Sequence, residues 1–586
     1  MRSNHQTKVG RRFNIMSAFR TIEAKPHTPV YTMHKYFARR PWNVFRELIS
    51  HYTSPADLVL DPFCGGGVTI VESLKLRRKV VGVDINPLAT YITKMEVRPV
   101  DLERFHRAFS QLAKRAREAI LKLYSTRCSK CSSEAHADWI EWDEQTRQIT
   151  RLRYECPICG SSAERLPTEE DVQLARKIDE EFVSHIDKGD LWYPRTPVPP
   201  GDKTSSLLSK NINHFYELFT KRNLLAFSLL FKEIGNVADE EAREFLKFAL
   251  SSSLKWASRQ SHLRGKIVEG WAMHAYWIYP RSLEINVWNT FERRVIAVAR
   301  GKRYGNRVIG DFCRLAQAFD DLTERDATCL ILTTSSVKLP IPDESIDSII
   351  TDPPYGGNVN YGELGDFWYV WLSGGLTMNK EDEVIINKTQ NKSLEEYEGM
   401  LHEVFRECYR VLKPRGRLVS TFNSKDMRVV ASFVTSASRA GFALHPDGFL
   451  YQRPIRAYTT TFHAMQIGAF VGDFVFAFVK EPQIQPADFM ARRALDEFEK
   501  YVRELLDENL REDMAEPQLR EMAYRALIPF LARCSKVDIS ACREAVDYFE
   551  TEMRKREDYF REVRRKITEK RRERYGDMAK RATGRY

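Results

Sequence analysis

Two short motifs, about 290 residues apart, carry residue types that could hold a cofactor and a reacting amine. The first, Asp61-Pro-Phe-Cys-Gly-Gly-Gly67, follows the apolar run Asp57-Leu-Val-Leu60. A glycine-rich turn between a strand and a helix lets a cofactor approach bare backbone. The second, Asp352-Pro-Pro-Tyr355, follows the β-branched run Ser348-Ile-Ile-Thr351. We therefore expect both motifs at the carboxyl edge of a sheet, where open α/β sheets bind their ligands.

The second motif suits chemistry on the exocyclic amine of a nucleobase, whose lone pair is delocalised into the ring. Asp352 can accept one N–H, and the carbonyl group of Pro353 or Pro354 can accept the other, since proline has no competing N–H. Tyr355 can stack on a base that has left the duplex. Positioning and electrostatics would dominate such catalysis. The alternative is a strand-end turn with a capping aspartate, which the strand pattern and the glycine motif disfavour.

The glycine motif predicts a site for S-adenosylmethionine. Gly65 to Gly67 would turn beneath its methionine part, and Asp84 ends the second predicted strand, where a ribose-binding acid is expected. A phosphate-binding loop for a dinucleotide is the alternative, which Asp61-Pro62-Phe63 and the second motif disfavour. We interpret Cys64 as a packing residue rather than a nucleophile. The residues predicted to line this cofactor site are Asp61, Pro62, Phe63, Cys64, Gly65, Gly66, Gly67, Thr69, Asp84 and Asn86.

With these motifs the chain resembles DNA amino-methyltransferases, and most of all the large adenine-specific DNA methylases that contain a zinc ribbon. The resemblance covers residues 31 to about 480. It is carried by the glycine motif and by three further segments: Tyr31-Thr-Met-His-Lys-Tyr-Phe-Ala-Arg-Arg-Pro-Trp-Asn-Val-Phe45, Phe219-Thr-Lys-Arg-Asn-Leu-Leu225 and Thr351-Asp-Pro-Pro-Tyr-Gly-Gly-Asn-Val-Asn-Tyr-Gly-Glu-Leu-Gly-Asp-Phe-Trp-Tyr-Val-Trp-Leu372.

The resemblance implies transfer of a methyl group from S-adenosylmethionine to adenine N6 in DNA. It places His34 and Lys35 in the cofactor pocket, within a motif running to Pro41. It places Asn358, Tyr361 and Glu363 beside the target base. One departure is Thr333-Thr-Ser-Ser336, where many relatives carry an acidic residue near the cofactor's adenine; hydroxyl groups could take that place.

Three other functions stay open from the sequence. Cytosine N4 is an alternative target, because the same motif can present any exocyclic amine. RNA guanine-N2 methyltransferases share similar motifs, although the long insertion and the segment after Tyr355 argue against them. A protein of another class, a catalytically inactive zinc-dependent nucleic-acid-binding protein, is disfavoured by the intact Asp352 and glycines.

Two cysteine pairs predict a metal site. Cys128-Ser-Lys-Cys131 and Cys156-Pro-Ile-Cys159 have 24 residues between them, a spacing that fits a four-thiolate structural Zn²⁺ site. An iron–sulfur cluster or redox-active pairs are the alternatives. Because so small a segment has little core of its own, metal binding should largely fold it, contributing on the order of 10 kcal/mol or more.

The order of apolar segments predicts an α/β fold: a doubly wound, Rossmann-like methyltransferase sheet interrupted by insertions. Strands are expected at 58–60, 79–83, 329–333, 345–351, 417–422 and 474–480. Helices are expected at 41–52, 68–76, 102–124, 215–234, 394–412 and 429–440, with a turn at 413–416. About two hundred residues between the second and third strands must be inserted domains. The predicted division is an N-terminal tail (1–30), the first part of the methyltransferase domain (31–124), a zinc ribbon (125–165), a helical insertion for target recognition (166–310), the second methyltransferase part (311–482) and a helical, basic extension (483–586).

Composition bounds the partners. The net charge is +11, and residues 554–586 hold 14 Lys/Arg against 6 Asp/Glu, so a basic C-terminal arm carries most of it. Such an arm suits sequence-independent attraction to DNA, with a solvated helix as the alternative. Basic residues alternate with aromatic residues between Lys255 and Arg281. Such a pattern suits a surface that binds nucleic acid, although a core of buried aromatic residues is the slightly favoured interpretation.

No apolar run is long enough for a membrane span and no signal segment is apparent, so we expect a cytoplasmic protein without a membrane partner. The sequence has no nuclease or helicase motif. Any cleavage would come from another protein of a restriction-modification or phage-defence system, and the oligomeric state is left open.

Overall fold

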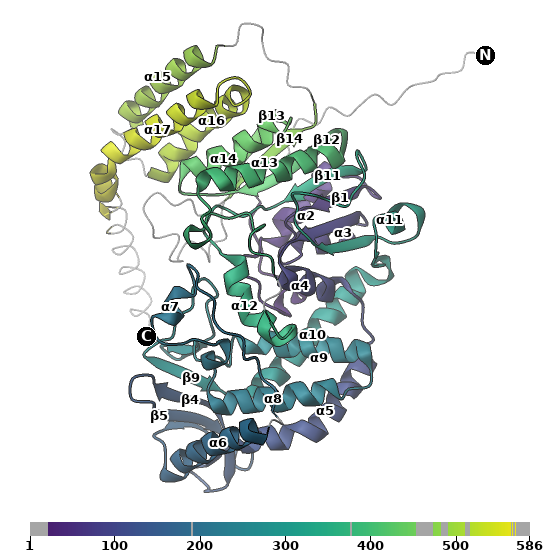
Figure 1. Ribbon diagram of the computed structural model, residues 1–586, viewed down its shortest axis with the longest axis vertical. Coiled ribbons are helices and arrows are strands. Elements are labelled where there is room, and N and C mark those ends of the chain that lie inside the picture. Colours follow the sequence, from purple (N-terminus) through teal and green to yellow (C-terminus); the bar gives the residue numbers. More distant parts are fainter. Residues whose placement is uncertain are drawn as a thin grey trace, which may run out of the picture. The chain divides into compact units, whose positions relative to one another are not determined.

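The computed structural model describes residues 22–188, 191–375, 378–452, 473–481, 490–509, 516–563, 565–566 and 569. The chain divides into two compact units. Figure 1 labels their helices and strands. The larger unit comprises Pro26–Pro342 and Gly356–Tyr397, and the smaller comprises Met1–Lys25, Asp343–Tyr355 and Glu398–Tyr586. The fold is mixed α/β with mostly parallel principal strands, which is consistent with a methyltransferase.

The larger unit contains the βα alternation that the sequence predicts. Parallel strands run in the order β10 (Cys329–Thr333), β2 (Lys79–Asp84), β1 (Leu58–Asp61). Helix α3 (Val68–Lys75) follows β1, and α4 (Pro87–Val97) follows β2. All four residues of β1 are buried, as expected for a short strand covered on both faces.

Helices make up most of the rest of the larger unit. Several begin at a side chain that accepts hydrogen bonds from the first turn, including Asn86 of α4 and Thr220 of α8. Their bounds are η1 (Pro29–Thr32), α2 (Trp42–Tyr52), α5 (Leu102–Lys122), α6 (Glu169–Lys188), α7 (Ser205–Leu208), η2 (Phe215–Leu218), α8 (Lys221–Gly235), α9 (Glu240–Leu254), α10 (Val287–Val308), η3 (Gly310–Phe312), α11 (Asp320–Glu324), α12 (Tyr361–Leu372) and η4 (Lys388–Gln390).

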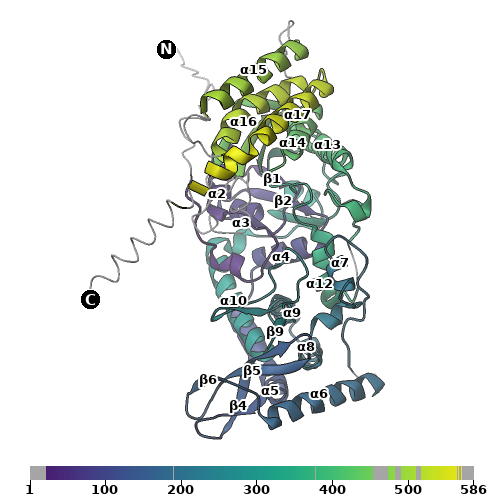
Figure 2. The same ribbon diagram turned by 90° about the vertical axis from the view of Figure 1, so that its left-hand side faces the viewer.

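The paired cysteines lie in an antiparallel sheet of the larger unit, which we call the cysteine sheet. Its order is β3 (Ser125–Arg127), β4 (Glu134–Asp143), β5 (Gln148–Glu155), β6 (Ser162–Arg165), and β9 (Arg281–Ile285) pairs with the other side of β4. In Figure 2, α6 runs beside this sheet. The predicted hairpin between Trp139 and Tyr154 is present. Strand β9 was not predicted, and it makes the cysteine sheet continuous with the segment that begins α10.

Helix α10 also holds the N-terminal motif of the larger unit. The Arg294 guanidinium donates to the carbonyl oxygens of Thr32 and Met33, at 2.5 and 2.7 Å. A Cβ added at Gly301 would lie 2.2 Å from the Met33 side chain, so α10 and this motif approach closely. The inserted residues therefore fix the backbone of the segment that leads to Tyr36.

The smaller unit has strands in the order β11 (Ile346–Thr351), β12 (Leu412–Phe422), β14 (Asp473–Val479), β13 (Ala443–Gln452). Strands β11 and β12 are parallel, whereas β14 is antiparallel to both of its neighbours. Its helices are α13 (Leu394–Val411), which begins in the larger unit's segment, α14 (Met427–Arg439), α15 (Ala491–Asn509), α16 (Glu516–Cys534) and α17 (Ile539–Lys555).

Three local predictions differ from the structure. The turn expected at 413–416 lies within β12, which begins at Leu412. The helix expected at 215–234 is divided into η2 and α8, because Thr220 caps a new helix. Strand β13 was not predicted; it contains a proline and a glycine, and its pairing with β14 has a register shift.

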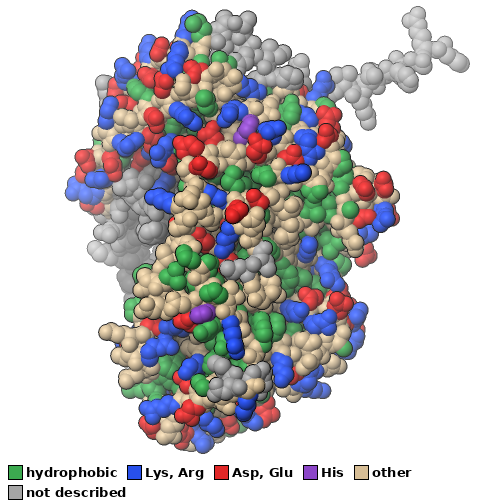
Figure 3. Space-filling model, in the orientation of Figure 1, with side chains coloured by type: hydrophobic (Ala, Val, Ile, Leu, Met, Phe, Trp, Pro, Cys, Tyr) green, Lys and Arg blue, Asp and Glu red, His purple; other side chains and the backbone are tan. Residues whose placement is uncertain are grey.

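Charge on the described surface is mixed. On the face drawn in Figure 3, acidic and basic side chains alternate rather than gather by sign. Of the basic arm predicted at 554–586, the structure describes residues 554–563, 565–566 and 569. Residues 1–21 of the predicted N-terminal tail lie outside the described residues. Within the described part of the chain, no helix is long and apolar enough to cross a membrane.

Candidate active site

The glycine motif forms a tight turn between β1 and α3 in the larger unit. Gly65 and Gly67 adopt φ of +47° and +75°, and Gly67 is the N-cap of α3. A Cβ on Gly67 would lie 2.8 Å from Oγ1 of Thr93, and one on Gly65 would lie 3.1 Å from the ring of Tyr36. Both the backbone conformation and the space therefore require glycine, and the turn presents bare backbone as predicted.

Asp84, at the end of β2, is tied to this turn. Its Oδ2 accepts the Gly65 N–H at 2.8 Å, and its Oδ1 accepts the Asn86 N–H at 2.9 Å. Burial raises the pKa of Asp84 to about 6, although these two hydrogen bonds oppose the shift. Each carboxylate oxygen can accept a second bond, so a ribose hydroxyl could still donate to it. Asn86 caps α4 through Oδ1, which also accepts the Tyr369 hydroxyl at 2.6 Å.

The residues around the turn are mostly engaged with the chain itself. The Phe63 N–H donates to Oδ1 of buried Asp61 at 3.1 Å, and the Ser336 hydroxyl donates to the Pro62 carbonyl at 2.5 Å. The Thr333 hydroxyl contacts that of Thr90 at 2.6 Å. The Ser335 hydroxyl accepts the Val337 N–H at 3.5 Å, so three of the four hydroxyls in the segment 333–336 already have partners within the larger unit.

Cys64 and Thr69 are both buried beside the turn. The Cys64 amide donates to the Val83 carbonyl at 2.9 Å, which joins the start of the turn to β2. Burial raises the pKa of the Cys64 thiol, so it stays protonated at neutral pH. This environment agrees with a packing residue and not with a nucleophile.

His34 and Lys35, which the resemblance places in the cofactor pocket, have different surroundings. The His34 ring is buried and stacks on Phe248 with centroids 5.3 Å apart, whereas Lys35 is exposed. Nδ1 of His34 lies 2.6 Å from the Lys35 carbonyl oxygen, and burial lowers the pKa of His34 to about 3. A neutral, buried imidazole indicates a packing role for this side chain.

The same motif reaches the glycine turn through Tyr36 and Arg39, which were not singled out from the sequence. Arg39 lies 3.1 Å from the Cβ position of Gly66 and pairs with buried Glu96 at 2.6 Å. Tyr36 approaches Gly65, as described above. The sequence marks both residues only as members of the motif 34–41. Which side chains of that motif face the glycines depends on the path of the backbone.

The segment after Tyr355 also contacts this motif. Tyr361, the first residue of α12, stacks on Tyr36 with centroids 6.0 Å apart and planes at 17°. Asn358 is exposed. Glu363 is buried, and its two oxygens accept the Lys203 N–H at 2.7 Å and the Asn387 amide at 2.8 Å. The Glu363 carboxylate therefore holds two segments of the chain together.

Asn360 is a further residue that sequence reasoning missed. It precedes α12 and is 1% exposed. Neither side-chain amide atom has a hydrogen-bond partner among the described residues. A buried carboxamide without partners is costly, so this position suits a ligand or an ordered water.

Asp352 lies in the smaller unit, just beyond β11, and is positioned by two hydroxyl groups. Thr421 donates to its Oδ1 at 2.5 Å, and Tyr355 donates to the same oxygen. The Tyr355 ring packs against Phe422 with centroids 4.7 Å apart, while Pro353 is buried. The parallel register sets Thr351 beside Ser420, which brings Thr421 to the end of β12 next to Asp352.

The four cysteines converge on one point of the cysteine sheet. Their sulfur atoms all lie within 4.8 Å of one another, with Cys128–Cys159 and Cys131–Cys156 each at 3.6 Å. Tetrahedral Zn²⁺ with Zn–S bonds of about 2.3 Å places sulfur atoms about 3.8 Å apart. The set therefore fits that ion.

The two Cys-x-x-Cys turns are built alike. The Ser132 and Gly160 amides donate to the carbonyls of the first cysteines, Cys128 and Cys156, at 2.9 and 3.0 Å. Ser132 and Gly160 both have positive φ, at +57° and +65°. Matching turns of this form can present four thiolates to one ion.

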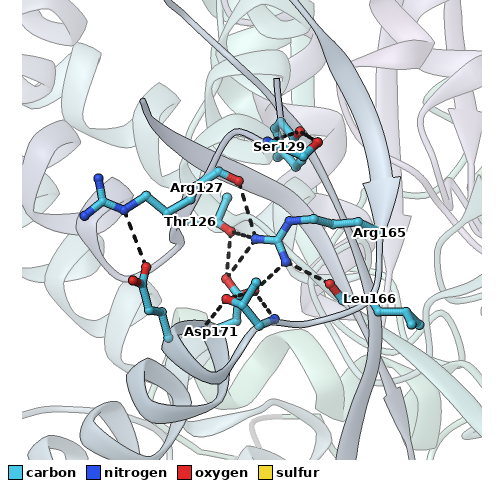
Figure 4. A network of polar contacts seen from close by, with 9 residues as sticks. Thr126, Arg127, Ser129, Arg165, Leu166 and Asp171 are labelled. Carbon is cyan, nitrogen blue, oxygen red and sulfur yellow. Dashed lines mark hydrogen bonds and ion pairs between the residues drawn. The ribbon is translucent and has the colours of Figure 1, made fainter. Parts of the chain in front are cut away.

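A network of hydrogen bonds between protein groups also links the edge strands of the cysteine sheet (Figure 4). Arg165 of β6 donates to Asp171 of α6 at 2.7 Å and to the Thr126 hydroxyl of β3 at 2.6 Å. The Thr126 hydroxyl in turn donates to Asp171 at 2.7 Å. The network joins the two strands at opposite ends of the order β3-β4-β5-β6, and it anchors them to a helix.

The family model that matches this chain and two of its relatives all carry the name of a methylase or methyltransferase. A family model described as DNA methylase matches residues 4–95 and 346–481. The chain is 24% identical over 359 residues to the type II methyltransferase M.MvaI of Kocuria varians, covering 60% of this chain and 57% of that protein. It is 19% identical over 448 residues to the type II methyltransferase M.MjaII of Methanocaldococcus jannaschii, covering 72% of this chain and 78% of that protein.

The family match includes both the glycine motif and the Asp352 motif and omits residues 96–345. The match to M.MvaI spans little more than half of that relative, whereas the match to M.MjaII spans more than three quarters. The model described as DNA methylase thus matches this chain in two segments, and both relatives are named type II methyltransferases.

Proposed function

We propose that the protein transfers a methyl group from S-adenosylmethionine to an exocyclic amine of a DNA base, with adenine N6 favoured over cytosine N4. The observation that carries this proposal is the end of β11. There Asp352 is held by two hydroxyl donors beside an aromatic ring, at the position of the family match.

In this proposal, Asp352 and the carbonyl oxygen of Pro353 or Pro354 accept the two N–H groups of the target amine. This arrangement would turn the nitrogen lone pair toward the methyl donor. Thr421 and Tyr355 fix the carboxylate, and the rings of Tyr355 and Phe422 offer an apolar surface to a base that has left the duplex. Transfer would break the S–CH3 bond of the donor, leaving a neutral thioether, as the N–C bond forms. The Asp352 carboxylate would stabilise the positive charge that develops on the nitrogen, and the amine proton would then pass to water.

The cofactor site of this proposal lies along the glycine turn of the larger unit. S-adenosylmethionine supplies the electrophilic methyl group when bound. The bare backbone of Gly65–Gly67 would accept its methionine part, and Asp84 would accept a ribose hydroxyl. We assign the neighbouring contact surface to Tyr36 rather than to His34, because the Tyr36 ring adjoins Gly65 while His34 is buried against Phe248.

We also propose that Cys128, Cys131, Cys156 and Cys159 hold a structural Zn²⁺, so that the cysteine sheet is a zinc ribbon. The sulfur separations support a single ion with four thiolate ligands. All four positions are protein ligands, which leaves no open site for catalysis by this ion.

One assay separates the candidate functions. The purified chain is incubated with methyl-labelled S-adenosylmethionine and, separately, with unmethylated genomic DNA and total RNA; labelled DNA is then digested to nucleosides. The proposal expects N6-methyladenine in DNA. N4-methylcytosine would select the runner-up, and label only in RNA would contradict the DNA assignment. No transfer together with no cofactor binding would favour the inactive nucleic-acid-binding protein.

A further inference from the structure

A small hairpin of the larger unit projects from the protein surface. Strands β7 (His262–Arg264) and β8 (Ile267–Glu269) pair with Arg264 opposite Ile267, which leaves Gly265 and Lys266 as a two-residue tip. Gly265 has φ of +62°, as the first position of a type II′ turn requires. No atom lies within 4 Å of its Cβ position, so the tip stands in open space.

The base of the hairpin is anchored. Leu263 and Val268, opposite each other in the hairpin, pack against the buried cluster of Trp139, Leu283 and Ile285 in the cysteine sheet. Because successive strand residues face opposite sides, Arg264 and Ile267 lie on the side away from this cluster. The hairpin is thus held at its base, and one face is turned outward.

The outward side chains do not serve the core. The Arg264 side chain is 75% exposed, and its contact with Glu269 at 3.2 Å is the kind of surface pair that contributes little to stability. Ile267 is 61% exposed, and Lys266 at the tip is also exposed. An exposed isoleucine between two cations combines apolar contact with positive charge.

Aromatic and basic groups extend this outward face. His262 stacks on Tyr279 with centroids 3.6 Å apart, and Tyr279 adjoins Trp277 at 6.5 Å. Trp277 is 53% exposed, and the Lys210 ammonium lies 4.5 Å from its ring centroid. By contrast Trp271 and Tyr276, from the same basic and aromatic segment, are buried. The two sequence interpretations of this segment therefore apply to different residues within it.

We propose that the β7–β8 hairpin reads DNA sequence from the major groove. This inference rests on the proposed function, and it adds the element that chooses the site. A two-stranded ribbon fits the major groove, which is about 12 Å wide and 8.5 Å deep. Strands of three residues extend about 10 Å, which matches that depth. The positive tip complements the phosphate backbone.

The outward residues have distinct roles in this arrangement. Arg264 donates to O6 and N7 of a guanine, and Ile267 contacts the methyl group of a thymine. Lys266 pairs with a phosphate group, which adds affinity without sequence preference. Trp277 and Lys210 contact the sugar–phosphate backbone beside the groove.

The test compares the wild type with Arg264→Ala, Lys266→Ala and the double variant. Arg107→Ala on α5 is the matched control, because Arg107 is 66% exposed and pairs weakly with Glu103 at 3.8 Å. Two fluorescent 30-base-pair duplexes are compared: one carries the unmodified sequence that the protein methylates, and the other carries that sequence scrambled. Fluorescence anisotropy measures the binding of each duplex at several salt concentrations. Thermal unfolding checks that every variant is folded.

Arg264→Ala is expected to reduce the preference for the site by about 5- to 150-fold, the value of one bidentate base contact. Lys266→Ala is expected to weaken binding to both duplexes and to lower the slope of log affinity against log salt by about one. Arg107→Ala should change neither quantity. If Arg264→Ala and the double variant keep wild-type preference and affinity, the hairpin proposal is wrong and the tip is free for a protein contact.

Methyl transfer and cofactor binding are measured on the same samples, so that the two proposals fail separately. Transfer to DNA with unchanged site preference in the hairpin variants contradicts the hairpin alone. Hairpin-dependent DNA binding without methyl transfer, measured on a duplex chosen by selection from a random pool, contradicts the enzymatic function alone. A wild type that binds no DNA contradicts both.

Discussion

The hydroxyl group of Thr421 gives the most direct test of how Asp352 is held. Thr421→Val replaces that hydroxyl with a methyl group of similar size at a position 2% exposed, so little repacking is expected. The change removes the 2.5 Å hydrogen bond to Asp352 Oδ1 and keeps the one from Tyr355. Hydrogen bonds to charged groups contribute about 1.5–3 kcal/mol. If Thr421 orients the carboxylate in the transition state, the methyl-transfer rate should fall by about 10- to 150-fold.

The assay is single-turnover methyl transfer to DNA, because product release then does not mask the chemical step. Affinities for DNA and for S-adenosylmethionine are measured in parallel, and both should stay close to wild type for a positioning residue. Thr435→Val is the matched control: Thr435 is also buried, but its hydroxyl donates to the Ala431 carbonyl at 2.9 Å within α14. A transfer rate for Thr421→Val within twofold of wild type would refute the assigned role, and an equal loss in Thr435→Val would indicate general destabilisation.

Three further predictions concern the cofactor and metal sites. Asp352→Ala should abolish methyl transfer while cofactor affinity, measured by calorimetry, is largely kept; unchanged turnover would overturn its catalytic role. Cofactor affinity should weaken as pH falls through about 6, because burial raises the Asp84 pKa to about 6 and the protonated carboxyl accepts hydrogen bonds less well. Asp84→Asn should bind the cofactor weakly, and its affinity should not change over this pH range. A wild-type pH profile in that variant would contradict the assignment. Chelation should release one Zn²⁺ per chain and loosen the turns at Cys128 and Cys156. The amide protons of β4 that pair with β9 should stay protected from hydrogen exchange. Loss of that protection would show that the metal folds the whole cysteine sheet.

Strands β1 and β11 could be predicted because each contains a short, buried, apolar run beside a recognisable turn. Strand β13 could not, because His445-Pro-Asp-Gly448 interrupts its apolar pattern, and its registered pairs with β14 lie on either side of that stretch. Likewise, the dense apolar residues of 215–234 concealed a cap at Thr220, whose hydroxyl accepts the Asn223 amide and starts a new helix.

The candidate site shows the same division between local and long-range information. The glycine turn and Asp352 could be predicted, because their chemistry is contained in a few adjacent residues. Thr421 reaches Asp352 only through the register of β11 and β12. The occupation of the Glu363 carboxylate by the Lys203 amide, 160 residues earlier in the chain, is likewise set by the tertiary fold.

The attachment of Arg294 to the carbonyls of Thr32 and Met33 limits how this protein can be divided or recombined. In the sequence, the residues between the two family-matched segments look like an insertion that could be deleted. Helix α10 of that insertion nevertheless packs against the segment that places Tyr36 and Arg39 beside the glycine turn. A shortened enzyme lacking 125–310 would lose that support along with its hairpin. Exchange of specificity between relatives would therefore have to transfer side chains on an intact scaffold rather than whole inserted domains.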